Sequence, residues 1–126
     1  MQLVCGDALD PPLAPDSFQR VASLNVMDAV QSAHQHLSVV DGLCVPGGEV
    51  VLSSPYLVPG SVGMGMLKEL RDRNVHVVAM TNSLGSTDEP VVHVGYSRYR
   101  GPMLDLGLEL YEVSATRVKR NRRENL

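Results

Sequence analysis

The stretch EVVLSSPYLVPG, residues 49–60, decides which fold this chain can adopt. Its first six residues form an apolar run of strand length, and the prolines at 55 and 59 mark the loop that follows. The residues PGG just before the stretch, 46–48, predict the end of a helix and a turn of the chain. The stretch is therefore predicted to close one strand–helix–strand unit and to open the next.

Similar segments recur on both sides of this junction. Strands are predicted at 2–5, 20–26, 49–54, 75–81 and 108–113, and helices at 27–43, 62–74 and 91–107. The strand runs are mostly continuously apolar, which is typical of parallel strands covered on both faces. The sequence therefore predicts an α/β fold: a three-layer α/β/α sandwich, Rossmann-like, with a mainly parallel sheet of about five strands and right-handed crossovers.

Length and composition favour a single folded domain. The chain has 126 residues, of which 44% are hydrophobic, enough for a core without disulfides or metal ions. We expect one α/β domain over residues 1–116. Residues 117–126 contain five of the eleven Lys and Arg residues, and we expect them to form a disordered basic tail. No specific nucleic-acid partner is expected, since this tail has no aromatic side chain for base stacking.

The two cysteines and the apolar runs indicate where the protein works. Cys5 and Cys44 are far apart and form no CxxC motif, which predicts two buried thiols in a reducing compartment rather than a disulfide. No apolar run reaches the roughly 18 residues that a membrane span needs, and the first residues show no signal peptide. The sequence therefore predicts a cytoplasmic protein without a membrane span.

Polar residues follow several predicted strands, at the edge where open α/β sheets bind their ligands. Asp7 and Asn25 could accept hydrogen bonds from a ribose or an amine, although such residues commonly start loops and cap helices. Thr81, Asn82 and Ser83 begin a loop rich in hydroxyl and amide groups, which could hold a phosphate or another substrate, or cap the next helix. These residues are the candidate binding residues.

Other motifs for phosphate, metal or catalytic chemistry are missing. The segment GSVGMG, residues 60–65, matches neither G-x-G-x-x-G nor G-K-[ST], so a turn and a closely packed helix start are the simpler interpretation. His34 and His36 are two apart on a predicted helix and therefore point in different directions. The chain has no H-E-x-x-H and no G-x-S-x-G. No catalytic residue and no metal site are predicted.

The first part of the chain, roughly residues 2–56, resembles the C-terminal half of a class I S-adenosylmethionine-dependent methyltransferase. The resemblance rests on GDALDPPLAPDSFQRVASLNVMDAV and HLSVVDGLCVPGGEVVLSSPY. It implies that Asp7 and Ala8 contact the adenine and that Asn25 lies beside the methyl donor or the substrate. The family's glycine-rich loop and ribose-binding acidic residue have no counterpart here, so no cofactor is expected, with S-adenosylmethionine as the alternative.

The second part, roughly residues 53–113, resembles the phospholipase D superfamily in its cardiolipin-synthase-like branch. The resemblance rests on TNSLGSTDEP, HVGYSRYR and GLELYE. That family works through H-x-K-x-x-x-x-D, in which the histidine attacks a phosphodiester. None of the four histidines here is followed by a lysine two residues later, so the resemblance implies an incomplete catalytic centre.

The two resemblances predict a chimera whose halves meet in the strand at 49–54, produced by engineered or de novo recombination or by natural fusion. We expect an α/β domain with no native catalytic activity, and so no enzyme. Two alternatives stay open: a truncated methyltransferase-like domain that binds S-adenosylmethionine or a nucleoside weakly, and a module that binds phosphodiesters or anionic lipids. A sheet cut open at its first strands leaves a bare edge, which predicts a homodimer.

Overall fold

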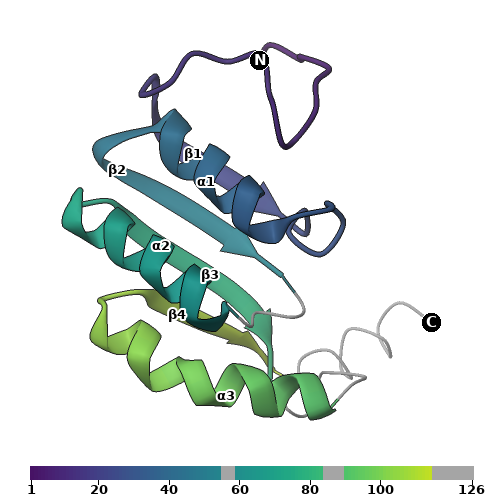
Figure 1. Ribbon diagram of the computed structural model, residues 1–126, viewed down its shortest axis with the longest axis vertical. Helices are drawn as coiled ribbons and strands as arrows, with labels where there is room; N and C mark the ends of the chain where they lie inside the picture. Colours follow the sequence, from purple (N-terminus) through teal and green to yellow (C-terminus); the bar gives the residue numbers. More distant parts are fainter. Residues whose placement is uncertain (55–58, 84–89, 115–126) are drawn as a thin grey trace.

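The computed structural model describes residues 1–54, 59–83 and 90–114, with side chains except at 90–93. Its elements are β1 (Phe18–Leu24), α1 (Ala33–Leu43), β2 (Cys44–Ser53), α2 (Gly60–Asp72), β3 (His76–Asn82), α3 (Pro90–Asp105) and β4 (Glu109–Val113). The four strands form one parallel sheet in the order β1-β2-β3-β4 (Figure 1). The predicted α/β fold with a mainly parallel sheet is confirmed.

The sheet has four strands rather than about five, because residues 2–5 stay outside it. Leu3 and Val4 are exposed, and Asp7 forms only an isolated bridge with Asp10. A parallel neighbour of β1 would require a crossover of a dozen or more residues, usually with a helix. The segment between them contains three prolines and no helix, so β1 becomes an edge strand.

All three helices lie on the same face of the sheet (Figure 1). The strand order follows the chain order, and right-handed crossovers taken in one direction place every helix on one side. Burial alternates accordingly along β2: Val50 and Leu52 are buried, whereas Val51 between them is half-buried. The described residues form two layers rather than the predicted three, because these crossovers leave the opposite face of the sheet without a helix.

The core fills the space between the helices and the covered face of the sheet. The strand predicted at 49–54 lies in β2 up to Ser53, between β1 and β3, and Ser54 directly follows it. Val50, Leu52 and Ser54 are only 0%, 2% and 4% exposed, which confirms their predicted burial. The other buried apolar side chains are Leu37, Val40, Cys44, Leu67, Leu70, Val75, Val77, Ala79, Tyr96, Met103 and Leu108.

The boundaries of α1 differ from the predicted helix at both ends. The helix begins after Ser32, whose hydroxyl accepts a hydrogen bond from the N–H of Gln35 at 3.2 Å, rather than at residue 27. At its other end it passes directly into β2, so the PGG segment lies inside the strand, where the register with β1 shifts between Phe18 and Arg20. A side chain at Gly48 would place its Cβ 2.7 Å from the carbonyl oxygen of Gln19 on β1. Glycine is required there because the two strands approach closely.

The two cysteines are free, as predicted, but only one is buried. Cys44 is 0% exposed, and burial raises the pKa of its thiol. Cys5 is exposed, which corrects the prediction of two buried thiols: it belongs to the segment outside the sheet.

This difference predicts two classes of thiol reactivity. An aromatic disulfide reagent is expected to modify one thiol per native chain, Cys5, because attack requires an accessible thiolate. Cys44 should react only when guanidinium chloride unfolds the chain. The Cys5→Ser variant is the control, and it should show no reaction in its native state. Two thiols reacting equally fast in the native protein would contradict the burial of Cys44.

Candidate functional site

A small cavity of about 90 Å³ lies at the carboxyl end of β2, between α1 and α2. This is the edge where open parallel sheets place their ligands. The walls are mostly apolar, and polar groups come from Asp28, His34 and Ser54. The remaining lining residues are Met27, Ala33, Leu37, Leu52, Pro59, Gly63 and Leu67. The cavity can hold a small apolar group with one polar end.

The cavity is narrow because α2 starts in close contact with α1. A Cβ at Gly63 would lie 2.9 Å from the Cβ of Pro59 and 3.8 Å from Nε2 of His34. The N–H of Gly63 donates to the carbonyl of Pro59 at 3.1 Å, and Nε2 of His34 lies 3.4 Å from the same carbonyl oxygen. The predicted closely packed helix start in residues 60–65 is therefore confirmed, and the segment forms the first turns of α2.

The candidate nucleoside-binding residues lie in two separate local arrangements. A carboxylate oxygen of Asp7 accepts a hydrogen bond from the N–H of Leu9 at 2.9 Å. Asn25 has a left-handed backbone with φ of 56°, and its side-chain oxygen accepts from the hydroxyl of Ser53 at 2.9 Å. The cavity beside Asp7 and Ala8 is lined by residues 4–13 alone, so it does not include Asn25. In this structure Asp7 and Ala8 thus line a pocket that does not include Asn25, and their contact with S-adenosylmethionine stays a prediction.

A buried pair of Ser23 and His36 holds Ala8 in place. The hydroxyl of Ser23 lies 2.7 Å from Nε2 of His36, and Nδ1 of the same ring lies 2.9 Å from the carbonyl oxygen of Ala8. Since a carbonyl only accepts, Nδ1 carries a proton, and Nε2 of the neutral ring accepts from Ser23. The two side chains are 4% and 6% exposed. The pair therefore ties the N-terminal segment to β1 and α1.

No local sequence pattern indicates this pair, because Ser23 and His36 are thirteen residues apart and belong to no motif. A serine hydroxyl bonded to a histidine is the start of a nucleophile arrangement. Here the third position is a neutral carbonyl instead of a carboxylate, so no negative charge beside Nδ1 would stabilise an imidazolium. Neither Ser23 nor His36 lines the cavity between α1 and α2.

The candidate phosphate-binding residues surround the end of β3. Thr81 is 4% exposed, Asn82 is half-buried, and the N–H of Ser83 lies 3.4 Å from the carbonyl oxygen of Val113. The register partner of Thr81 on β4 is Glu112, so a carboxylate lies beside the predicted phosphate ligand. The rest of the predicted loop, residues 84–89, lies outside the described residues, as does the basic tail at 117–126.

Glu112 joins α3 to β4. The hydroxyl of Tyr96 donates to its carboxylate at 2.9 Å, and Nε of Arg100 lies 3.1 Å from the same oxygen. Burial and the neighbouring carboxylate raise the pKa of Tyr96 to about 12, which keeps its hydroxyl protonated as a donor. All three residues belong to the motifs HVGYSRYR and GLELYE. In this structure those motif residues link a helix to the sheet.

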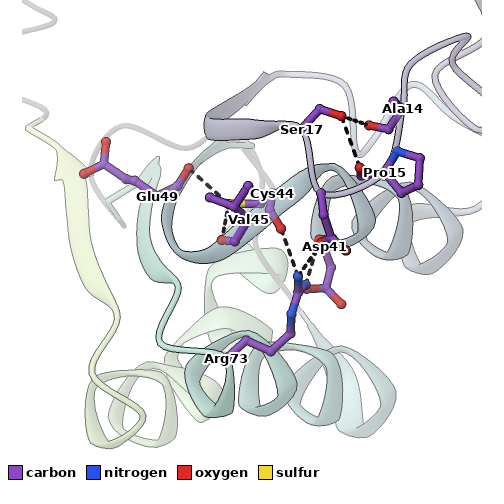
Figure 2. Close-up of polar contacts among 9 residues, drawn as sticks. Ala14, Pro15, Ser17, Asp41, Cys44, Val45, Glu49 and Arg73 are labelled. Carbon is purple, nitrogen blue, oxygen red and sulfur yellow. Dashed lines mark hydrogen bonds and ion pairs between the residues drawn. The ribbon is translucent and has the colours of Figure 1, made fainter.

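The densest polar cluster lies at the opposite, amino end of the sheet (Figure 2). The guanidinium of Arg73, at the end of α2, contacts the side chain and the carbonyl of Asp41 and donates to the carbonyl of Cys44 at 2.9 Å. It also pairs with Asp16 at 2.8 Å. The two carboxylates outweigh the effect of burial and raise the pKa of Arg73. One charged group thus joins α1, α2, β2 and the loop before β1.

The described residues contain neither a metal-binding cluster nor a helix that could span a membrane. Among residues 1–54, 59–83 and 90–114 no group of three or more His, Cys, Asp and Glu side chains could hold a metal ion. Within the same part of the chain, no helix has the length and the apolar character needed to cross a bilayer.

The fold and the cavity define the class of protein to which this chain belongs: a parallel α/β domain with its helices on one face. The chain is 39% identical over 72 residues to cardiolipin synthase C of Escherichia coli (strain K12). The matched segment covers 57% of this chain and 15% of the relative. Uncharacterized proteins of two Helicobacter pylori strains are each 34% identical over 64 residues, covering 51% of this chain and 13% of the relative. The chain thus spans only 13–15% of the length of the curated relatives it matches.

These similarities support the predicted phospholipase-D-like segment. No family model and no solved structure matches the chain. None of the relatives described above supports the methyltransferase-like half, which stays a prediction, as does the junction between two halves.

Proposed function

We propose that this chain is a chimeric α/β domain without catalytic activity of its own. In this proposal a methyltransferase-like part, residues 2–56, and a phospholipase-D-like part, residues 53–113, meet in β2. The phospholipase-D-like part is supported by the similarity to cardiolipin synthase C.

The observation that carries the proposal is the double pairing of β2. Residues 49–53 pair in register with residues 20–24 of β1 on one side and with residues 76–80 of β3 on the other. The same five residues therefore complete the ladder of both parts. A junction at the end of this strand leaves the alternation of buried and exposed side chains unbroken.

Three histidine side chains of the described residues contact groups within the fold, which supports the absence of catalytic activity. Both ring nitrogens of His36 are engaged by Ser23 and Ala8 inside the protein. His76 on β3 is bonded to Glu109, and Nε2 of His34 faces the carbonyl of Pro59. Each of these histidines thus contacts a group of the fold, so none is presented as an uncommitted nucleophile to the cavity.

The test is a set of activity assays on the intact chain. We expect no hydrolysis of bis(p-nitrophenyl) phosphate, no turnover of phosphatidylglycerol and no methyl transfer from S-adenosylmethionine above the buffer blank. His34→Ala and His36→Ala are the matched variants, since His34 lines the cavity and His36 is buried away from it. Turnover that disappears in either variant would refute the proposal and identify the histidine responsible.

Binding of anionic phospholipid is a second candidate function, favoured by the similarity of 72 residues to a cardiolipin synthase. The chain should then sediment with vesicles that contain cardiolipin and not with vesicles of phosphatidylcholine alone. If the basic tail carries the contact, deletion of residues 117–126 should abolish it and added salt should weaken it. Equal recovery from both vesicle types would eliminate this candidate.

Weak nucleoside binding at Asp7 is tested separately by calorimetry with S-adenosylhomocysteine. The pocket beside Asp7 does not include Asn25, so we expect no heat of binding at millimolar ligand.

A further inference from the structure

The face of the sheet that points away from the helices carries two different rows of side chains. No helix of the described residues covers this face (Figure 1). We call it the open face. It is formed by alternate residues of the four strands: Arg20, Ala22 and Leu24 of β1, Glu49, Val51 and Ser53 of β2, His76, Val78 and Met80 of β3, and Glu109 and Tyr111 of β4.

The row toward the carboxyl end of the strands is mainly apolar. Leu24, Met80 and Tyr111 are 60%, 47% and 49% exposed. Register pairing joins Leu24 to Ser53, Ser53 to Met80 and Met80 to Tyr111, so the row is continuous across all four strands. Ala22, Val51 and Val78 form the next row, which ends at Glu109 on β4. A contiguous apolar surface of this kind marks an interaction site.

The row toward the amino end alternates in charge. Register pairing joins Arg20, Glu49 and His76 across β1, β2 and β3. On β4, Glu109 is in register with Val78, one row further on, and its carboxylate reaches back to His76. Nε of Arg20 lies 2.8 Å from Glu49, and Nε2 of His76 lies 2.9 Å from Glu109. Hydrogen bonds from Tyr111 and His76 lower the pKa of Glu109, so its carboxylate is charged at neutral pH. Basic and acidic groups therefore alternate from one edge of the sheet to the other.

This order of charges is complementary to itself about one particular two-fold axis. If the axis runs parallel to the strands, between β2 and β3, then β1 of one copy faces β4 of the other. Glu49 then faces His76 of the second copy. Arg20 lies one row from Glu109 of the second copy, whose carboxylate reaches back toward the charged row. The same rotation keeps the direction of the strands, so the apolar row faces the apolar row. An axis across the strands would instead place the charged row against the apolar row, which would leave charges buried without partners.

We propose that a second copy of this chain docks on the open face through its own open face, with the two-fold axis parallel to the strands. Two sheets packed in this way resemble the aligned layers of a β-sandwich. A C2 contact of this kind is closed, because both copies use the same surface. The contact differs from strand pairing at the edge of the sheet, which would leave the open face exposed.

The interface is small, so the dimer depends on concentration. Four strands about 4.8 Å apart and about five residues long present a patch of only a few hundred Å². That is at the low end of specific interfaces. Association is therefore expected in the micromolar range, and mass action should shift the chain from monomer toward dimer as its concentration rises.

Sedimentation equilibrium of the intact chain between about 5 and about 500 μM tests the proposal in the range where micromolar association is visible. Wild type should pass from monomer to dimer. Leu24→Asp and Met80→Asp should weaken the dimer at least about tenfold, since each puts a charge into an apolar contact. Val94→Asp is the matched control: Val94 is 67% exposed but lies on α3, on the other side of the sheet. Circular dichroism melting should show that every variant remains folded.

A pair of charge variants tests the axis itself. Alone, Arg20→Glu places a like charge near Glu109 of the second copy, and Glu109→Arg places a like charge near its Arg20, so each should self-associate at least about tenfold more weakly than wild type. A mixture of the two variants restores an opposite charge at both contacts of a mixed dimer. The mixture should therefore associate more tightly than either variant alone, although contacts within each chain are unchanged by mixing.

Three results would overturn the proposal. The first is a wild-type monomer at the highest concentration. The second is a dimer that Leu24→Asp and Met80→Asp leave intact, which would move the contact to the strand edge or to the helices. The third is a mixture of the charge variants that associates no better than its components, which would exclude this two-fold axis.

Discussion

The Val50→Asp variant is expected to lose cooperative folding. Val50 is 0% exposed and points from the central strand β2 into the core beneath the helices. A carboxylate there would lose its hydration and gain no partner, since the surrounding buried side chains are apolar. We expect a destabilisation of more than about 4 kcal/mol, which is a large share of the total stability of a domain of this size.

Val51→Asp is the matched control, one residue later on the same strand. Its side chain lies on the open face and is half-buried, so its carboxylate would still reach water. We expect a cost of about 1 kcal/mol, mainly from weaker strand propensity. The two variants are compared by thermal melting at low micromolar concentration, at which the chain is expected to be monomeric. Similar losses for both would show that both faces are covered and would contradict a sheet with helices on one side.

Arg73→Ala is expected to destabilise the fold by about 2–4 kcal/mol, because the change leaves charged and polar partners without their donor. The Arg73 side chain is 29% exposed and that of Asp41 is 24% exposed, so water replaces their contact only in part. The carbonyl of Cys44 would lose its 2.9 Å hydrogen bond from the guanidinium as well. Urea unfolding followed by circular dichroism gives the change in free energy.

Arg71→Ala provides the comparison for this cluster. Arg71 lies two residues before Arg73 near the end of the same helix, is 46% exposed and pairs with its neighbour Asp72 at 3.3 Å. An exposed pair of this kind contributes little, so we expect a loss below about 0.5 kcal/mol. Equal effects of the two substitutions would mean that the Arg73 contacts add nothing beyond an ordinary surface charge.

The sequence located the elements of this fold with fair success, because their signals are local. Apolar runs of strand length marked β2, β3 and β4, and repeats of three and four residues marked α1 and α2. Parallel pairing followed from the alternation of strands and helices along the chain. Gly63 could be assigned to a close helix contact because glycines cluster at the start of α2.

The contacts of the candidate site residues could be predicted from the sequence much less well than the strands and helices. Asp7, Ala8 and Asn25 were grouped by a family resemblance, but their observed hydrogen bonds run to Leu9, His36 and Ser53. The contact between Ser23 and His36 gives no local pattern, and neither does the contact between Arg73 and Asp16, which spans 57 residues. Such pairs exist only after the chain has folded.

The sequence alone determined that this chain builds parallel strands joined by helices around the central run at residues 50–54, since hydrophobic period and turn residues act over a few neighbours. Only the tertiary structure decided which strand lies at the edge, that all three helices share one face, and which side chains meet across the sheet. The same apolar sequence occurs in a strand whether a helix covers its second face or that face stays open for a partner. The order and handedness of the connections decide whether the second face is covered, and residues far apart in the chain set both.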